Sequence, residues 1–259
     1  MLMGIRQHEI MKLLELKQQI TITELAEMFK VSHMTIRRDL DQLQAEGRIQ
    51  RSHGGAVKVK RFMGADYDQR ANENKAEKVA IAKEAVSHIR DGMSIILDAG
   101  TTVAAMVEEL EKFKDLKIIT RDLHTALLLS NEEKFSSFDV YCTGGRLSKW
   151  AYSLDGIYTE KMLDSLTVDV AFLTCEAISH VKGAMAWSPV LVGARQSAMN
   201  AADKNILLVD STKFSYNSFA IFASLDSFEE IITESGLDDN EANVYKAAGY
   251  PIRIVPVSS

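Results

Sequence analysis

The stretch V-S-H-M-T-I-R-R-D-L-D-Q-L at positions 31–43 decides how the first part of the chain folds. Ser32 is a favourable helix N-cap, because its hydroxyl can accept a backbone N–H of the first turn. Ile36, Leu40 and Leu43 recur at helical spacing and make one apolar stripe. Other side chains fall off that stripe, on faces open to solvent: Thr35, Arg37 and Arg38. The stretch therefore predicts a short amphipathic helix with one buried face.

The solvent-facing residue types of this helix suit the major groove of DNA. Arginine can bind a guanine edge with two hydrogen bonds, and both threonine and arginine can bind phosphate. An ordinary amphipathic helix with a solvated charged face would show the same pattern. Only the flanking sequence can distinguish a DNA-recognition helix from an ordinary amphipathic helix.

The residues before this helix predict two more helices. Ile5 to about Lys17 shows apolar residues at helical spacing. Thr21 and Glu24 stand at capping-box spacing before a second helix that would end near Phe29, with Thr23 as a rival N-cap. Only a tight turn then separates it from the Ser32 helix. This order is the helix-turn-helix plan, whose second helix enters the DNA groove.

The residues after the Ser32 helix predict a two-stranded wing. Residues 47–51 and 56–60 alternate apolar with basic or polar side chains, and S-H-G-G at 52–55 can turn sharply between them. A plain surface hairpin is the alternative, and His53 can equally stabilise the turn. With Ser32 and His33 at the helix start, the wing completes our set of predicted DNA contacts: Ser32, His33, Thr35, Arg37, Arg38, Arg51, His53, Lys58 and Lys60.

Charge is unevenly distributed along the chain. The net charge is −6, but residues 1–61 carry 11 Lys and Arg against 7 Asp and Glu, a balance of +4. The remainder carries 19 against 29, a balance of −10. A basic front on an acidic body is typical of a nucleic-acid-binding domain joined to a second domain.

The rest of the chain alternates strands and helices. Apolar strand runs are expected at 93–97, 116–120, 138–142, 168–174, 205–209, 231–233 and 252–255. Helices are expected from about 78 to 90, after the 98–102 loop through Leu110, and around 123–129, 157–164, 191–202 and 239–248. Such alternation predicts an α/β domain with a largely parallel sheet.

Three loops that follow strands have side chains suited to a small anionic ligand. In open α/β sheets, ligands bind beyond the carboxyl ends of the strands. The loops contain small residues, hydroxyls and cations, although a βα loop with glycine is more often only a tight turn. The predicted ligand contacts in them are Asp98, Gly100, Thr101 and Thr102 in the first, Gly144, Gly145 and Arg146 in the second, and Asp210 and Lys213 in the third. Together they favour a phosphorylated small molecule.

The N-terminal pattern resembles the signature of the DeoR family of bacterial transcription regulators. The matching run is T-I-R-R-D-L-x-x-L-x-x-x-G-x-I-x-R-x-H-G-G-A, within residues 5–57. D-A-G-T-T at 98–102, T-G-G at 143–145 and A-A-D-K-x-x-L-L-V-D-S-T-K-F at 201–214 resemble that family's C-terminal sensor domain. The resemblance implies a fold similar to ribose-5-phosphate isomerase, with a sugar phosphate as the effector bound by those loops.

Three positions depart from the family pattern. Thr120-Arg121 stands where Thr-Asn is frequent, Cys175-Glu176 where a glycine-rich stretch is common, and Arg195-Gln196 where a lysine is frequent. We count Arg121 and Glu176 among the predicted effector contacts. They point to a different sugar phosphate or to a weakened site.

Composition sets the remaining expectations. No apolar run approaches the ~20 residues that span a bilayer, and Met1–Gly4 leads straight into a charged amphipathic segment, which is unlike a signal peptide. Cys142 and Cys175 lie in strand-like runs and are expected to be buried free thiols in the cytoplasm. We expect no metal site, no cofactor and no catalytic residue.

We therefore predict a winged helix-turn-helix domain at 1–60, a linker at 61–77 and an α/β effector-sensing and oligomerisation domain at 78–259. The predicted function is a DNA-binding regulator, favoured as a repressor of carbohydrate genes. It would bind double-stranded operator DNA as a dimer or tetramer, and a sugar phosphate would relieve repression. One rival is a sugar-phosphate isomerase or transferase with an accessory DNA-binding head, using Asp98, Glu176 or Asp210 as a base. Another is a DNA-binding scaffold with a vestigial sensor.

Overall fold

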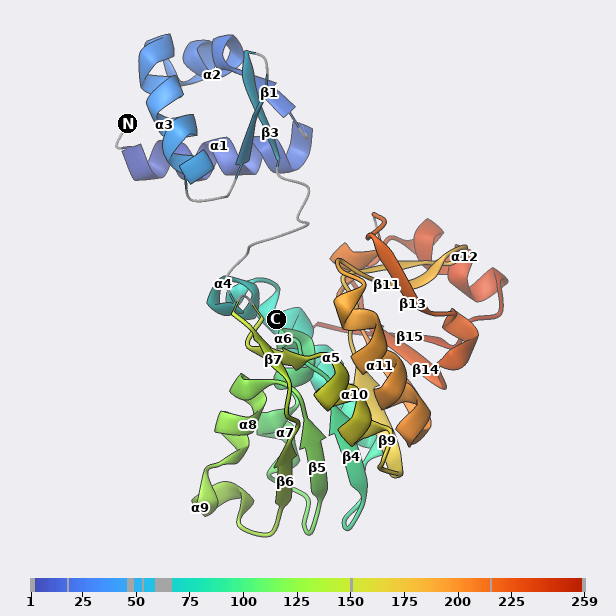
Figure 1. The fold of residues 1–259 in the computed structure, drawn as a ribbon. Helices are drawn as coiled ribbons and strands as arrows, with labels where there is room; N and C mark the ends of the chain where they lie inside the picture. Colours follow the sequence, from blue (N-terminus) through green and yellow to red (C-terminus); the bar gives the residue numbers. More distant parts are fainter. Residues whose placement is uncertain are drawn as a thin grey trace. The chain divides into compact units, whose positions relative to one another are not determined.

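The computed structural model describes residues 3–17, 19–45, 49–52, 54–58, 67–149, 151–214 and 216–257 (Figure 1). Its internal contacts divide the chain into two compact units, Met1–Ala65 and Asp66–Ser259. We call the first the head and the second the body, and describe each by itself.

The head is a winged helix-turn-helix, as predicted. Its antiparallel sheet has the strand order β1-β3-β2. The helices are α1 (Met3–Lys17), α2 (Ile22–Phe29) and α3 (His33–Ala45), and the strands are β1 (Gln19–Thr21), β2 (Ile49–Ser52) and β3 (Gly55–Lys58). Only β1 was not predicted, because three residues between two helices are too short to show an alternating pattern.

The two predicted helix caps of the head are formed, while the rival cap Thr23 is not used. The Thr21 hydroxyl accepts the Glu24 N–H at 3.2 Å, and the Glu24 carboxylate accepts the Thr21 N–H at 2.8 Å. Ser32 accepts the backbone N–H of Thr35 at 3.2 Å. The caps set where α2 and α3 begin, so that Ile36, Leu40 and Leu43 are fully buried in one core with α1 and α2.

A buried ion pair joins α1 to α3. The guanidinium of Arg6 donates from Nε to Asp39 at 2.5 Å and from Nη2 to the other carboxylate oxygen at 3.0 Å. Both residues are buried, and this contact raises the pKa of Arg6. Because Asp39 points inward, α3 can expose its neighbours Arg37 and Arg38 while it stays anchored to the head.

The wing contacts the start of α2 through its two glycines. The carbonyl of Gly54 accepts the N–H of Ile22 at 2.8 Å, and Gly54 has a φ of +86°. Gly55 pairs with Thr21 across the sheet, and a Cβ there would overlap the carbonyl oxygen of Ile20. The turn therefore requires glycine at 54 for backbone conformation and at 55 for the close approach of β1.

The body is built on a seven-stranded parallel sheet in the order β15-β14-β12-β9-β4-β5-β6. All seven strands match predicted strand runs. They are β4 (Ser94–Leu97), β5 (Lys117–Thr120), β6 (Asp139–Cys142), β9 (Val168–Leu173), β12 (Ala202–Leu208), β14 (Glu230–Glu234) and β15 (Ile252–Val255). Strand order reverses between β4 and β9, so these two strands border the topological switch point.

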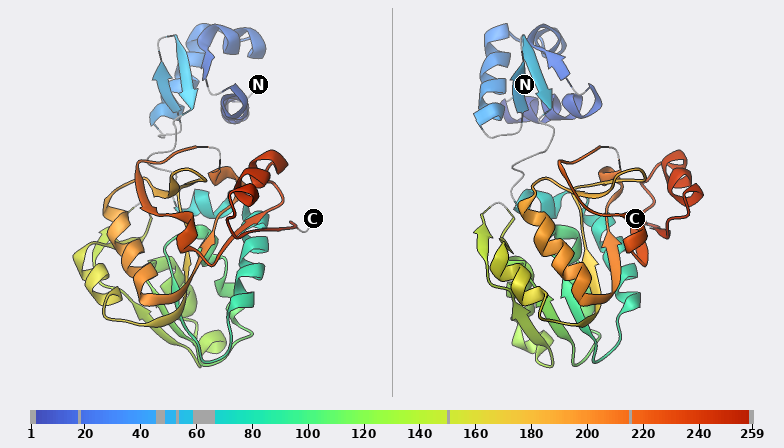
Figure 2. Two further views of the ribbon diagram at one scale, coloured as in Figure 1. Left: turned by 90° about the vertical axis from the view of Figure 1, so that its right-hand side faces the viewer. Right: turned by 45° about the vertical axis from the view of Figure 1, so that its right-hand side comes forward.

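Helices cover both faces of the sheet (Figure 2). Alternate strand residues enter two separate cores: Ile96, Ala171 and Leu207 pack into the core under α11, whereas Ile95, Val170 and Ile206 pack into the core under α5. The helices are α4 (Tyr67–Asn72), α5 (Lys75–Ala85), α6 (Thr101–Ala104), α7 (Val107–Leu110), α8 (Leu123–Leu129), α9 (Glu132–Phe135), α10 (Ile157–Leu163), α11 (Val190–Ala201) and α12 (Asp239–Ala247), with the 3₁₀ turns η1 (Val86–His88), η2 (Ser211–Lys213) and η3 (Leu225–Ser227).

Three predictions for the body are corrected. The single helix expected after the 98–102 loop and through Leu110 is two short helices, α6 and α7, the first beginning at Thr101, with a turn at residues 105–106. Cys175 is buried, but Cys142 is exposed, because it ends β6 at the edge of the sheet. Five short strands were missed: β7 (Arg146–Ser148) and β8 (Ser153–Asp155) form one hairpin, and β10 (Ala177–Ser179), β11 (Gly183–Ala186) and β13 (Ala220–Ala223) form a small antiparallel sheet. No described helix is long and apolar enough to cross a membrane.

The two wing glycines give a matched test of the head. We expect Gly55→Ala to open the β1–β3 pairing and to cost about 2–3 kcal/mol, as overpacked sites do. Gly54→Ala meets no atom within 4 Å and should cost only the ~1 kcal/mol of left-handed backbone. Hydrogen exchange of the full chain would show faster exchange at Gln19–Thr21 in Gly55→Ala alone. Equal exchange in the two variants would contradict the close approach.

Candidate functional site

The candidate ligand site of the body lies at the switch point, where the loops after β4, β5 and β9 meet α11 and the β7–β8 hairpin. Asp98 follows β4, Arg121 follows β5, and Glu176 lies three residues beyond Leu173, which ends β9. Arg195 comes from α11 and Asp155 from β8. These five charged side chains form one connected network, which we call the Asp98 network.

Asp98 and Arg121 form the buried half of the network. Arg121 donates from Nε to Asp98 at 2.6 Å and from Nη1 to Asp155 at 2.5 Å. The hydroxyl of Ser153 donates to the second oxygen of Asp155 at 3.1 Å. Asp98, Arg121 and Asp155 are all at most 3% exposed. A bound molecule cannot reach these three groups without a rearrangement, so they hold the site together rather than face a ligand.

Arg195 and Glu176 form the half of the network that reaches solvent. Arg195 donates from Nε to the other oxygen of Asp98 at 3.3 Å, and from Nη1 and Nη2 to the two oxygens of Glu176 at 2.8 and 3.1 Å. Its guanidinium also lies 5.0 Å over the ring of Phe222. The side chain of Arg195 is 2% exposed, whereas that of Glu176 is 30% exposed. Glu176 is thus a carboxylate with a fixed orientation and one open side.

Burial and the neighbouring opposite charges shift the pKa values of these groups in opposite directions. Burial alone would raise the pKa of Asp98, but the charges of Arg121 and Arg195 outweigh it and hold that pKa below its ordinary value. For Asp155, burial outweighs Arg121, and its pKa is raised. Burial also opposes the charge of Arg195, yet Glu176 and Asp98 overcome it and raise its pKa. The three carboxylates and two guanidiniums leave one net negative charge.

The loop at 143–146 packs against the same hairpin. A Cβ on Gly145 would lie 2.8 Å from the carbonyl oxygen of Asp155, so the loop backbone directly contacts β8. The hydroxyl of Thr159 donates to the Gly144 carbonyl at 2.6 Å. Gly144, Gly145 and Arg146 are exposed. The loop at 98–102 is closed in a similar way, because a Cβ on Gly100 would lie 2.5 Å from Thr174 Cγ2. Thr101 is half-buried and Thr102 buried.

The third predicted loop contacts Asn74, the N-cap residue of α5. Asp210 is 2% exposed; one of its oxygens accepts the Thr212 N–H at 3.1 Å and the side-chain amide of Asn74 at 3.4 Å. Lys213 Nζ lies 3.8 Å from the other oxygen and is about a quarter exposed. Burial raises the pKa of the Cys175 thiol to about 12; the charge of Glu176 adds to this rise, whereas Arg195 and then Lys213 oppose it.

An aromatic cluster joins α4 to the loop after β5. The ring of Tyr67 stacks on that of His124 at a centroid distance of 3.9 Å, and both meet Tyr152 edge-on. His124 follows Asp122, whose carboxylate caps α8 and accepts the Gly100 N–H at 3.1 Å. The 98–102 loop is thus linked to Tyr67 of α4 through Asp122 and the nearby His124, a link that sequence patterns did not reveal.

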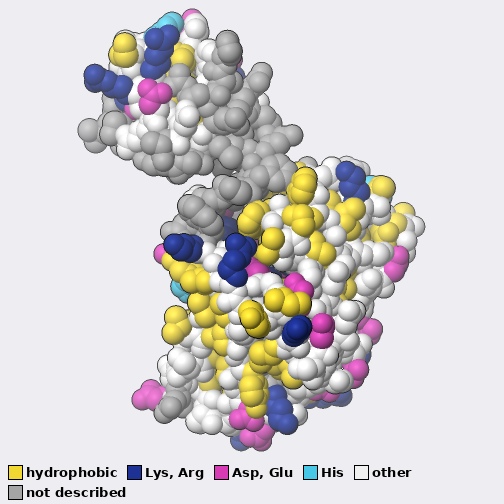
Figure 3. All heavy atoms as spheres, viewed as in Figure 1, with side chains coloured by type: hydrophobic (Ala, Val, Ile, Leu, Met, Phe, Trp, Pro, Cys, Tyr) yellow, Lys and Arg dark blue, Asp and Glu magenta, His cyan; other side chains and the backbone are white. Residues whose placement is uncertain are grey.

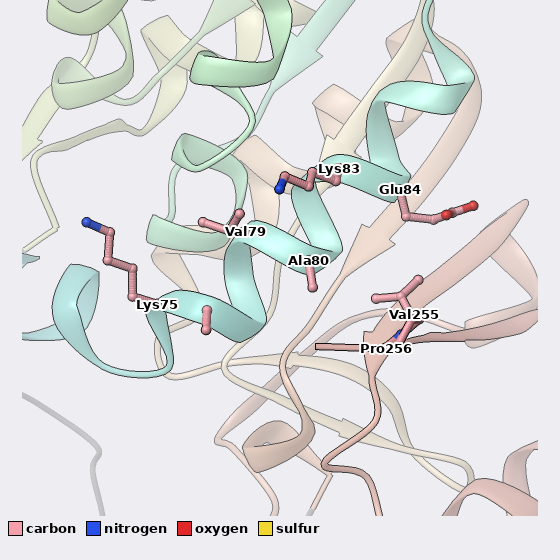
Figure 4. Close-up of a pocket in the computed structure, with 8 residues that line it drawn as sticks. Lys75, Val79, Ala80, Lys83, Glu84, Val255 and Pro256 are labelled. Carbon is pink, nitrogen blue, oxygen red and sulfur yellow. The ribbon is translucent and has the colours of Figure 1, made fainter. Parts of the chain in front are cut away.

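A separate groove of about 630 Å³ lies between α5 and the end of β15 (Figure 4). Lys75, Lys83, Glu84, Val79 and Val255 are among its lining residues. None of the predicted effector contacts lines it, so its size alone does not make it the ligand site. Among the described residues, no three His, Cys, Asp or Glu side chains are arranged to hold a metal ion.

The candidate DNA-binding face of the head is the exposed side of α3. His33, Arg37 and Arg38 are exposed, as is Ser32 before the helix. Thr35 is half-buried, and its hydroxyl lies 2.9 Å from that of Ser32, so these two hydroxyls are engaged with each other. Arg51 and Lys58 belong to β2 and β3. His53 and Lys60 lie outside the described residues.

Loss of charge should destabilise the body to different extents at two aspartates of the Asp98 network. Asp98→Asn leaves two buried guanidiniums undercompensated and should destabilise the body by about 3–5 kcal/mol at pH 7. Asp155→Asn should cost less than half of that, because burial already disfavours the charged form of Asp155. Both tryptophans belong to the body, so urea unfolding followed by their fluorescence measures the difference.

The stability difference between the Asp98→Asn and Asp155→Asn variants depends on pH, in a direction set by the sign of each aspartate's pKa shift. The lowered pKa of Asp98 means that its contribution is present above an ordinary carboxyl pKa and is lost as pH falls through the lower folded value. The pKa of Asp155 is raised, so its contribution to stability is present below an ordinary carboxyl pKa and is lost as pH rises through the higher folded value. Equal destabilisation by both variants at pH 7 would contradict the central place of Asp98.

Two family models match the chain. The DeoR-like helix-turn-helix domain matches residues 6–62, and the DeoR C-terminal sensor domain matches residues 73–235. Among solved structures, ribose 5-phosphate isomerase A from Methanocaldococcus jannaschii aligns with 55% of each chain at 21% identity and a TM-score of 0.39. That likeness says nothing about activity.

Curated relatives agree with the family models over nearly the whole chain. The helix-turn-helix-type transcriptional regulator YulB of Bacillus subtilis is 34% identical and covers 100% of this chain and 99% of its own length. The lactose phosphotransferase system repressor of Lactococcus lactis is 34% identical over 89% of this chain and 90% of its own. The chain therefore belongs to the DeoR family of helix-turn-helix transcriptional regulators.

Proposed function

We propose that the chain is a repressor of carbohydrate genes whose body binds a phosphorylated sugar and thereby releases the head from its operator. The observation that carries this proposal is the Asp98 network, which places one oriented, half-exposed carboxylate, Glu176, at the switch point of the sheet. Relatives named as lactose phosphotransferase system repressors support the link to sugars.

The sugar and phosphate ends of the ligand would meet different groups. Glu176 uses its inner side for Arg195, so its outer side can accept sugar hydroxyls. Lys213 is a partly exposed cation 3.8 Å from Asp210 and would hold the phosphate, with the exposed Arg146 at the start of β7 as a second cation. Backbone of the glycine loops would approach the ligand closely. The remaining predicted contacts would position these groups: Asp98, Gly100, Thr101, Thr102, Arg121, Gly144, Gly145 and Asp210.

An isomerase function gains no support from the position of Asp98. Both of its oxygens accept guanidinium hydrogen bonds, and the residue is 1% exposed. A general base must reach the proton that it abstracts. Asp98 is not placed to do so, and the relatives described above are regulators rather than enzymes.

Signal transfer would run through α4, the first described element of the body. Asn74, just beyond α4, contacts Asp210, and Tyr67 within α4 stacks on His124. Buried Lys78 donates to the carbonyl of Glu73 at 2.6 Å and also to that of Arg70, which fixes α4 to α5. A ligand that moves either loop changes the contacts of α4, and its differential affinity for the two states sets the size of the response.

The regulator would act as a homo-oligomer, a dimer or tetramer. A single head contacts few phosphates, so operator affinity requires two heads on repeated half-sites. Figure 3 shows hydrophobic side chains gathered over the part of the body that holds α8, β6 and α10. The exposed apolar residues of these elements and the adjoining β7 are Leu127, Leu128, Tyr141, Leu147, Ile157 and Tyr158. Together with the open edge of β6, they offer a surface for a second copy.

Thermal unfolding tests the ligand proposal. A phosphosugar that binds only the folded body must raise the unfolding midpoint, by the equivalent of ~2.7 kcal/mol at one hundred times its Kd. We expect a shift with one member of a phosphosugar panel and none with its unphosphorylated parent. Lys213→Met should abolish most of that shift.

The matched control is Lys117→Met. Lys117 is an exposed lysine that begins β5, at the opposite end of the parallel strands from the site, and its loss should leave the shift unchanged. A panel without any stabilising phosphosugar, or an equal shift in wild type and Lys213→Met, would contradict the proposed site.

A further inference from the structure

The recognition helix α3 presents an apolar side chain that its sequence pattern does not require. Met34 is the second residue of α3 and is 60% exposed. Among the described side chains of the head, Met28 on α2 is the other exposed large apolar group, at 49%. Met34 contributes little to the head's core, which is formed on the opposite stripe of α3 by Ile36, Leu40 and Leu43.

Met34 shares its face of α3 with two arginines. Arg37 and Arg38 follow it by three and four residues, the spacing that places side chains next to one another on a helix. Both arginines are exposed. Thr35 does not compete for this face, since its hydroxyl is engaged with Ser32 at the helix start. The outward face of the first two turns is therefore one thioether chain flanked by two guanidiniums.

The major groove contains one apolar group that such a face can read. In helix-turn-helix proteins, the N-terminal residues of the second helix contact base edges. Arginine reads guanine there, whereas the thymine 5-methyl group is read by apolar contact. The flexible, polarisable side chain of methionine fits surfaces of irregular shape. Met34 occupies the N-terminal turn, where base contacts are made.

We propose that Met34 contacts the 5-methyl group of a thymine in each operator half-site and so selects a T·A pair beside the positions read by Arg37 and Arg38. The proposal rests on DNA binding by the head and goes beyond it, because it assigns one base preference to one side chain. It is independent of any effector.

Uracil substitution isolates the methyl group. Binding-site selection with the full-length wild-type chain would first define the operator, and each thymine would then be replaced by uracil, which keeps every hydrogen bond of thymine. Kd would be measured by fluorescence anisotropy at one salt concentration. For wild type, we expect one thymine per half-site at which uracil weakens binding about fourfold, the equivalent of ~0.8 kcal/mol for one buried methyl group.

The same replacement should not affect Met34→Ala, whose affinity for the thymine operator should already be lower by a similar factor. Met28→Ala is the matched control and should keep the full preference for thymine, since α2 has no arginine at the corresponding spacing. Because both methionines are exposed, each variant should fold, which the hydrogen exchange of α3 would verify.

Two results would overturn the proposal: wild type that is indifferent to uracil at every position, or Met34→Ala that retains the thymine preference. A selection that enriches no sequence would overturn sequence-specific binding itself. It is distinguishable from failure of the thymine contact, because the latter leaves an enriched operator that wild type still binds.

Discussion

Two buried guanidinium groups need a compensating negative charge, and in the body Asp98 lies between them and supplies it. Its two oxygens accept from Arg121 and Arg195, which come from the end of β5 and from α11. Through these arginines, Asp98 also fixes Asp155 on β8 and Glu176 beyond β9. The switch point of the sheet is therefore built around one buried charge, and Glu176 is the member of the network that reaches water.

The head also contains a buried arginine–aspartate ion pair, which joins two helices rather than five side chains. Arg6 and Asp39 hold α1 against α3, which leaves the first turns of α3 to present Met34, Arg37 and Arg38. In both units a buried arginine–aspartate pair positions the groups that would meet a partner, whether DNA or an effector. Within the body, Asn74 just beyond α4 contacts Asp210 and Tyr67 of α4 stacks on His124, and our proposal assigns the response to a ligand to these contacts.

Local sequence patterns predicted the elements of this fold better than its contacts. The seven strands of the parallel sheet were found because each coincides with a short, largely apolar run, and Asp98 and Glu176 were found because they follow such runs. Asp155 was missed because β8 has only three residues. Arg195 was noted as a departure from the family pattern, but its partner Asp98 is 97 residues away, and no periodicity links the two. Arg6 and Asp39 escaped notice for the same reason. The exposure of Met34 was not predicted, because the sequence pattern of α3 marks only its polar and charged residues as solvent-facing.

The central claim, that a ligand at the Asp98 network controls the head, is tested most directly by operator release. Fluorescence anisotropy would follow the full-length protein leaving its selected operator as a phosphosugar is added, for wild type and Glu176→Gln. We predict that both bind the operator equally without ligand, and that Glu176→Gln needs at least tenfold more phosphosugar for release. Identical release curves, or release that no phosphosugar causes, would contradict the account.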